Sequence, residues 1–142
     1  MTHEEFVGQV QHRAHLPSRG AAETVIRAVL ETLAERTEHR AAAHVAAQLP
    51  HPIGRFLEQR REFHRLSLPE FFQRVRELEE TSVDIAAAAY HARVVLEVLE
   101  EGVTEGALAK IRAGLPADFD PLFKSGSKGP LHEPESRESQ QG

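Results

Sequence analysis

Apolar residues along this chain recur at the spacing of amphipathic helices, and no segment alternates in the manner of a β-strand for long enough to compete. Ile26, Val29, Leu30 and Leu33 form an i, i+3, i+4, i+7 stripe, the clearest of several. Shorter stripes of the same kind predict further helices, the first from Glu4 to about His12. The pattern therefore predicts an all-α fold.

The chain also matches itself at an offset of 66 residues. Val29-Leu30-Glu31 aligns with Val95-Leu96-Glu97, and Leu49-Pro50 aligns with Leu115-Pro116. A duplicated unit explains ordered matches of this kind better than chance does. We therefore predict two tandem pseudo-symmetric helical repeats of three to four helices each, packed into one compact helical bundle.

The repeats and their flanks divide the chain into four parts. We predict helical repeat 1 over residues 1–57, an inter-repeat segment over 58–67, helical repeat 2 over 68–123, and a disordered tail over 124–142. The tail is rich in Ser, Gly, Glu and Gln, and its one large apolar residue is Leu131. Such a segment buries too little apolar surface to offset the entropy of ordering.

Capping residues predict where the helices start. Ser18 is expected to start the second helix of repeat 1, and Thr37 the third. In repeat 2, Thr81 or Ser82 is expected to cap the long helix, and Thr104 the helix after it.

Composition narrows the functional classes. The 142 residues are 40% hydrophobic and 27% charged, which is ordinary for a globular domain. The absence of cysteine excludes thiolate nucleophiles, cysteine-bound zinc and disulfides. A formal charge of −5 disfavours nucleic acid as a partner. The polar start Met1–Glu5 and the lack of a long apolar run predict neither a secretory signal nor a membrane span, so we expect a cytoplasmic protein.

Motifs that carry chemistry are missing from the sequence. The nine histidines include no Glu-x-x-His or His-Glu-x-x-His arrangement, and scattered surface histidines are the favoured interpretation. No Gly-x-Ser-x-Gly, phosphate-binding loop or dinucleotide fingerprint occurs. We therefore predict no enzymatic activity, no cofactor and no metal, with a metal site assembled from distant histidines left as an alternative.

The two long helices differ beside their core stripes. Tyr90, Val94 and Val98 stand where the first repeat has Thr24, Ala28 and Thr32. The second long helix is thus apolar around much of its circumference, so other elements must bury it on two sides. Either repeat 1 supplies the second cover, or the residues form an exposed patch for a homodimer or another protein.

A basic stretch lies between the repeats. Arg55, Arg60, Arg61, His64 and Arg65 cluster there, with Phe56 and Phe63 interleaved. Cations beside aromatic rings can bind nucleic acid through phosphate contacts and stacking. Neighbouring glutamates and the acidic net charge favour the other interpretation, an inter-repeat helix or linker with both phenylalanines buried and the arginines in water.

An ordered set of motifs resembles a known family. Repeat 1 carries Glu-Glu-Phe-x-x-x-Val, Arg-Ala-Val-Leu-Glu-Thr-Leu-Ala-Glu-Arg and His-Val-Ala-Ala-Gln-Leu-Pro, and repeat 2 carries Leu-Pro-Glu-Phe-Phe-x-x-Val, Ala-Arg-Val-Val-Leu-Glu-Val-Leu and Ile-Arg-Ala-Gly-Leu-Pro-Ala-Asp-Phe-Asp-Pro-Leu-Phe. Together these resemble the bacterial domain-of-unknown-function family 2267, whose members carry this tandem arrangement. The resemblance covers Glu4 to Phe123 and implies a bacterial, helical, cytoplasmic protein, without a mechanism or catalytic residues to transfer.

The lack of catalytic motifs and the different apolar faces of the two long helices together favour a non-enzymatic protein-interaction or regulatory module. Its partner would be an unknown protein or a second copy of the chain. The alternatives are a nucleic-acid-associated protein that uses the Arg55–Arg65 cluster, and a helical bundle that binds a small molecule or metal. The candidate interaction residues are Tyr90, Val94, Val98, Phe63, Arg60, Arg61 and Arg65.

Overall fold

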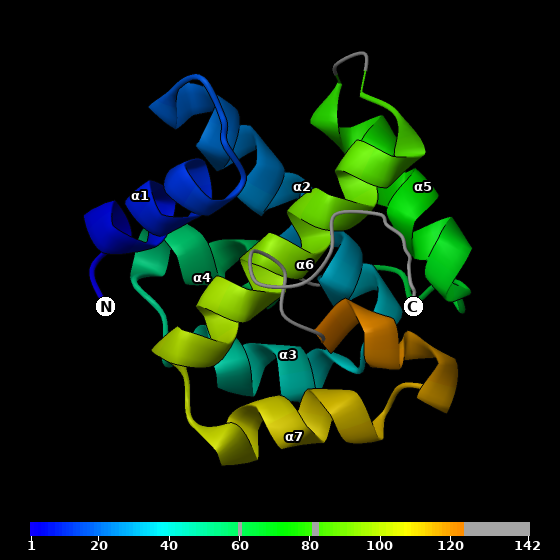
Figure 1. The fold of residues 1–142 in the computed structure, drawn as a ribbon. Coiled ribbons are helices and arrows are strands. Elements are labelled where there is room, and N and C mark those ends of the chain that lie inside the picture. Colours follow the sequence, from blue (N-terminus) through cyan, green and yellow to red (C-terminus); the bar gives the residue numbers. More distant parts are fainter. Residues whose placement is uncertain (60, 81–82, 124–142) are drawn as a thin grey trace, which may run out of the picture.

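The computed structural model describes residues 1–59, 61–80 and 83–123, which form seven α-helices and one 3₁₀ helix (Figure 1). No strand occurs within these ranges, so the predicted all-α class is confirmed. The predicted tail, 124–142, lies outside the described residues. The elements are α1 (His3–Arg13), α2 (Arg19–Arg36), α3 (His39–Ala46), α4 (His51–Glu58), α5 (Leu68–Glu79), α6 (Ile85–Gly102), α7 (Glu105–Ala113) and η1 (Ala117–Phe123).

Side-chain caps start most of these helices, as expected from the sequence. The Ser18 hydroxyl accepts a hydrogen bond from the Ala21 amide, which confirms the predicted start of α2. Thr104 caps α7 in the same way. Capping satisfies backbone N–H groups that have no partner inside the helix.

Two of the predicted caps are wrong. The buried Thr37 hydroxyl donates to the Leu33 carbonyl oxygen at 2.7 Å and closes α2, while α3 begins after Glu38 without a side-chain cap. In the second half, Asp84 caps α6, with its carboxylate 2.8 Å from the Ala87 amide. Thr81 and Ser82, the residues predicted for this role, lie outside the described residues.

Two long helices, α2 and α6, form the centre of the molecule. Helix α2 contacts α1, α3, α4, α5 and α6, and twelve of its 18 residues are buried. Helix α6 contacts α1, α2, α5 and η1, and runs diagonally across the view in Figure 1. Both helices are therefore covered on several sides, and each repeat-sized half of the chain packs on the long helix of the other.

The order of elements recurs at the offset found in the sequence. Helices α2 and α6 start at residues 19 and 85, and α3 and α7 start at 39 and 105, a difference of 66 in each case. The fourth elements, α4 and η1, start at 51 and 117. Pro121 lies inside η1 and has no N–H to donate, which disfavours an α-helix there.

Candidate interaction surface

The predicted surface patch on α6 is wrong for two of its three residues. Val94 and Val98 are both fully buried, because α1 and α2 from the first half of the chain pack against α6. Tyr90 is half-buried, and its hydroxyl donates to the Arg13 carbonyl oxygen at 2.7 Å. The second apolar face of α6 is therefore buried by the first half of the chain, and these side chains form part of the contact between the two halves.

An ion cluster reinforces that contact. The Arg13 guanidinium at the end of α1 donates to Glu97 at 2.9 Å and to Glu101 at 2.9 and 2.8 Å, both on α6. The hydrogen bonds that Arg13 donates to Glu101 hold the pKa of Arg13 above its usual value. A bidentate contact between a guanidinium and a carboxylate fixes the relative orientation of the two groups in addition to attracting them electrostatically.

The segment between the halves is an irregular strap, defined here as residues 61–66, that is bound to the C-terminal half of α2. Arg61 pairs with Glu31 at 2.9 Å, and the His64 amide donates to the Glu35 carbonyl oxygen at 2.8 Å. Arg36 in turn donates from Nε to the Leu66 carbonyl oxygen at 2.7 Å. These contacts fix the strap along its length without helical structure.

Two buried carboxylates on α2 explain why the strap is basic. Glu31 and Glu35 are only 5% and 4% exposed. Arg74 on α5 binds both Glu35 oxygens at 3.1 Å, and this hydrogen bonding raises the pKa of Arg74. A buried carboxylate is costly unless it is paired and hydrogen-bonded. Arg61 and Arg74 therefore neutralise the two carboxylates on α2 and are not free to bind phosphate, which disfavours nucleic-acid binding. Arg60, another of the candidate residues, lies outside the described residues.

Other strap residues face solvent. Phe63 is 49% exposed, with the Arg36 guanidinium 5.7 Å from its ring centroid. Arg65 is exposed and makes no ion pair within the described part of the chain. The interpretation in which both interleaved phenylalanines are buried is thus wrong for Phe63, while Phe56 is half-buried.

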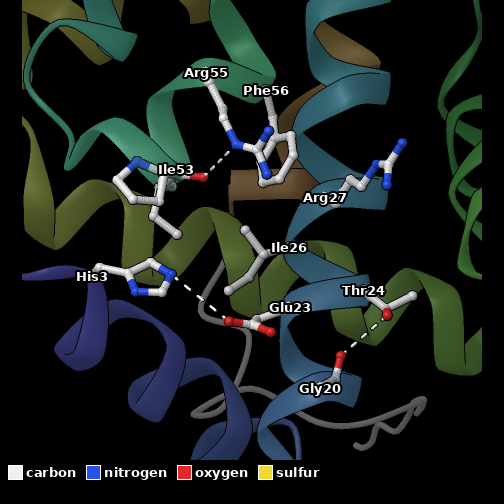
Figure 2. A pocket seen from close by; sticks show the side chains of 10 residues that line it. His3, Gly20, Glu23, Thr24, Ile26, Arg27, Ile53, Arg55 and Phe56 are labelled. Atoms are coloured by element: carbon white, nitrogen blue, oxygen red, sulfur yellow. Dashed lines mark hydrogen bonds and ion pairs between the residues drawn. The ribbon is translucent and has the colours of Figure 1, made fainter.

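A pocket of about 390 Å³ lies between α2 and α4 (Figure 2). The Arg55 guanidinium lies 4.7 Å from the Phe56 ring centroid and donates to the Pro52 carbonyl oxygen at 3.4 Å. On the opposite wall, His3 approaches Glu23 to 3.9 Å. Arg55 has no carboxylate partner among the described residues, so this rim can accept an acidic group.

One buried pair escaped the sequence analysis. His91 on α6 is 7% exposed, and its Nδ1 lies 2.9 Å from a carboxylate oxygen of Glu79 on α5, which is 3% exposed. The expectation that the histidines lie on the surface is wrong for His91. The sequence does carry a sign of this pair. Glu79 follows Phe71 and Val75 at intervals of four residues on α5, so a polar side chain occupies a position on the buried face of the helix.

Two further searches of the described residues bear on function. No group of three or more His, Asp or Glu side chains in those ranges could hold a metal ion. None of the described helices has the length and apolar character that crossing a membrane requires.

Comparison with known proteins places the sequence in one family. The sequence model described as "Uncharacterized conserved protein (DUF2267)" matches residues 3–122, from the start of α1 into η1. No curated protein matches the sequence. The family description names no activity, so the function has to be argued from the surface.

Proposed function

The chain belongs to the DUF2267 family of uncharacterized conserved proteins, and on that premise we propose that it is a non-enzymatic interaction module. It binds a protein partner through Phe63 and the arginines beside it, and acts as an adaptor or regulator in the bacterial cytoplasm. The absence of cysteine fits a reducing compartment.

The observation that carries this proposal is the exposed Phe63 on a fixed strap. Burial of a solvent-exposed aromatic side chain by a partner lowers the free energy of the complex. The strap is already held by Glu31, by the Glu35 carbonyl and by Arg36, so binding orders little additional chain. Preorganised aromatic and arginine side chains are typical of the residues that dominate protein interfaces.

The chemistry of the partner follows from the neighbouring charges. Arg65 on the strap lacks a carboxylate partner among the described residues, whereas Arg61 is already paired. The matching surface has an apolar recess for the Phe63 ring, flanked by acidic side chains. Such complementarity sets partner choice and association rate more than affinity.

A comparison of two exposed-residue variants tests the proposal. Phe63→Ser removes the aromatic ring from the strap, and Ile85→Ser removes another exposed apolar side chain, 44% accessible, at the start of α6. Both variants are expected to keep the wild-type circular dichroism spectrum, because neither side chain is in the core. Tagged full-length proteins are then used to capture partners from native lysate, with and without nuclease.

We expect a nuclease-resistant protein that wild type and Ile85→Ser capture and that Phe63→Ser does not. Equal capture by all three proteins contradicts the proposal. Partners that disappear with nuclease, and whose capture falls steeply with salt, support the nucleic-acid alternative instead. If the captured protein is the chain itself, sedimentation velocity will show an oligomer that Phe63→Ser dissociates.

A further inference from the structure

A second site lies away from the strap, in a cleft where the two halves of the chain meet. The cleft has a volume of about 460 Å³ and is bordered by the α1–α2 connection, the first turns of α2, the end of α5 and the middle of α6. Its walls are mainly apolar, with Leu16, Pro17 and Val25 on one side and Val83 on the other. The Glu79–His91 pair forms its polar part.

His91 has one ring nitrogen in use and one available. Glu79 takes Nδ1, at 2.9 and 3.2 Å from its two oxygens, and no described residue bonds Nε2. Across the described residues, the fully enclosed side-chain nitrogens without a partner are Nε of Arg61 and Nε of Arg93. Nε2 of His91 is not among them, and the residue, which is 93% buried, lines the cleft.

The pair also fixes what Nε2 can do. In the neutral form of the imidazole, an Nδ1–H that donates to the Glu79 carboxylate leaves the lone pair on Nε2 as an acceptor. A ligand that supplies a hydrogen-bond donor therefore matches this acceptor. The complementary ligand group is thus a hydroxyl or an amine.

The charges that border the cleft disfavour an anionic ligand. Glu79 and Glu80 both border the cleft, and no Lys or Arg of the described chain is part of its lining. In a partly enclosed site an anion would be repelled by these carboxylates, whereas a neutral or cationic donor would not. The apolar walls favour a hydrocarbon or aromatic body on the same molecule.

From these observations we infer that the cleft is a binding site for a small, mainly apolar alcohol or amine that donates a hydrogen bond to Nε2 of His91. The site is independent of Phe63 and of the proposed protein partner. Ligand occupancy would bridge the α1–α2 connection to α5 and α6.

Three matched probes test this inference on the isotopically labelled full chain. Benzylamine and benzyl alcohol carry a donor on the same ring, and benzoate replaces the donor with an anion. We expect both donors to shift the NMR signals of His91 and Val25 saturably, with dissociation constants on the order of 1 mM, as for small fragments. Benzoate is expected to bind at least about tenfold more weakly, because its carboxylate faces Glu79 and Glu80.

Two variants assign the site. Ala21→Trp fills the cleft from α2 and should abolish the shifts. His91→Asn keeps an N–H donor toward Glu79 and removes Nε2, so affinity for the donors should fall about tenfold. Gly8→Ala, on α1 and outside the cleft lining, is the control and should bind as wild type.

Several results would overturn the inference. They are the absence of saturable shifts with either donor, affinity for benzoate equal to that for the donors, or undiminished binding by folded Ala21→Trp and His91→Asn proteins. The probe comparison is made on wild type, so it decides the question even if a variant fails to fold.

Discussion

At the scale of single residues, polar groups on the apolar stripes are tolerated because another element supplies a partner. Glu35 on α2 receives Arg74 from α5, and Glu79 on α5 receives His91 from α6. In each case the buried carboxylate would be costly alone and is stabilised by a side chain distant in sequence. Polar residues at core positions therefore mark the contacts that join elements.

Backbone proximity is a second residue-scale constraint, and it predicts opposite effects for two helical glycines. A Cβ on Gly54 would lie 2.6 Å from the Ala46 carbonyl oxygen, because α3 and α4 approach closely there. Gly54→Ala should therefore reduce the free energy of unfolding by about 2 kcal/mol. Gly8 on α1 has no atom within 4 Å of the same position. Gly8→Ala should increase it by roughly 0.5–1 kcal/mol, since alanine favours the helix.

Urea denaturation followed by circular dichroism measures both values. The pair is matched, because each change adds one methyl group inside a helix. Stabilisation by Gly54→Ala would contradict the close approach of α3 and α4.

At the scale of elements, the helices were predictable and some of their ends were not. The stripe from Ile26 to Leu33 predicted α2, and Ser18 and Thr104 predicted two helix starts. Thr37 failed as an N-cap because its hydroxyl bonds back to the Leu33 carbonyl, an alternative that sequence spacing does not distinguish. Asp84 was missed because an acidic residue serves equally well as a cap or as surface charge.

The candidate surface was harder to predict than the helices. Phe63 and Arg65 were among the predicted residues, but Val94 and Val98 are buried. A second apolar face on a helix looks the same in sequence whether the chain itself or a partner covers it. The His91–Glu79 pair depends on how α5 and α6 pack, which periodicity within each helix does not give.

The strap is the element whose order depends most on individual ion pairs. Arg61 and Arg27 both lie 2.9 Å from the same Glu31 oxygen, but Arg61 is 25% exposed and Arg27 is 65% exposed. Arg61→Ala should lower hydrogen-exchange protection of the His64 amide about tenfold, because a charged hydrogen bond is worth roughly 1.5 kcal/mol. Arg27→Ala should change it little, as exposed pairs contribute about 0–1 kcal/mol.

Native-state exchange followed by NMR gives this comparison directly. The His64 amide is a suitable reporter, since it donates to the Glu35 carbonyl oxygen across the strap contact. Equal losses of protection in the two variants would mean that Arg61 does not hold the strap in place.

At the scale of the whole molecule, the two halves share one core. Val94 and Val98 on α6 are covered by α1 and α2, and Arg13 on α1 is bound to Glu97 and Glu101 on α6. Neither half buries its long helix alone, so we expect unfolding to be a single cooperative transition. The cleft beside His91 lies at this junction, where a ligand would act on both halves at once.

Tyr90 reports on that junction, because its hydroxyl donates to the Arg13 carbonyl oxygen at 2.7 Å and the chain has no other tyrosine. Burial, the largest cause, raises the pKa of Tyr90 above its ordinary value of 10.0. The native state therefore keeps this proton at a pH where the unfolded chain has lost it. Stability should accordingly fall as the pH rises past about 10.

The tyrosinate absorbance band measures this shift without a label. We expect its midpoint at a higher pH in the native protein than in concentrated guanidinium. Between pH 9 and 11, roughly one unit on each side of the ordinary value, wild-type stability should fall more steeply than that of Tyr90→Phe, which has no proton to lose. Equal midpoints in native and denatured protein would mean that Tyr90 is not buried at the junction, and that the contact between α1 and α6 is looser than the hydrogen bond to Arg13 implies.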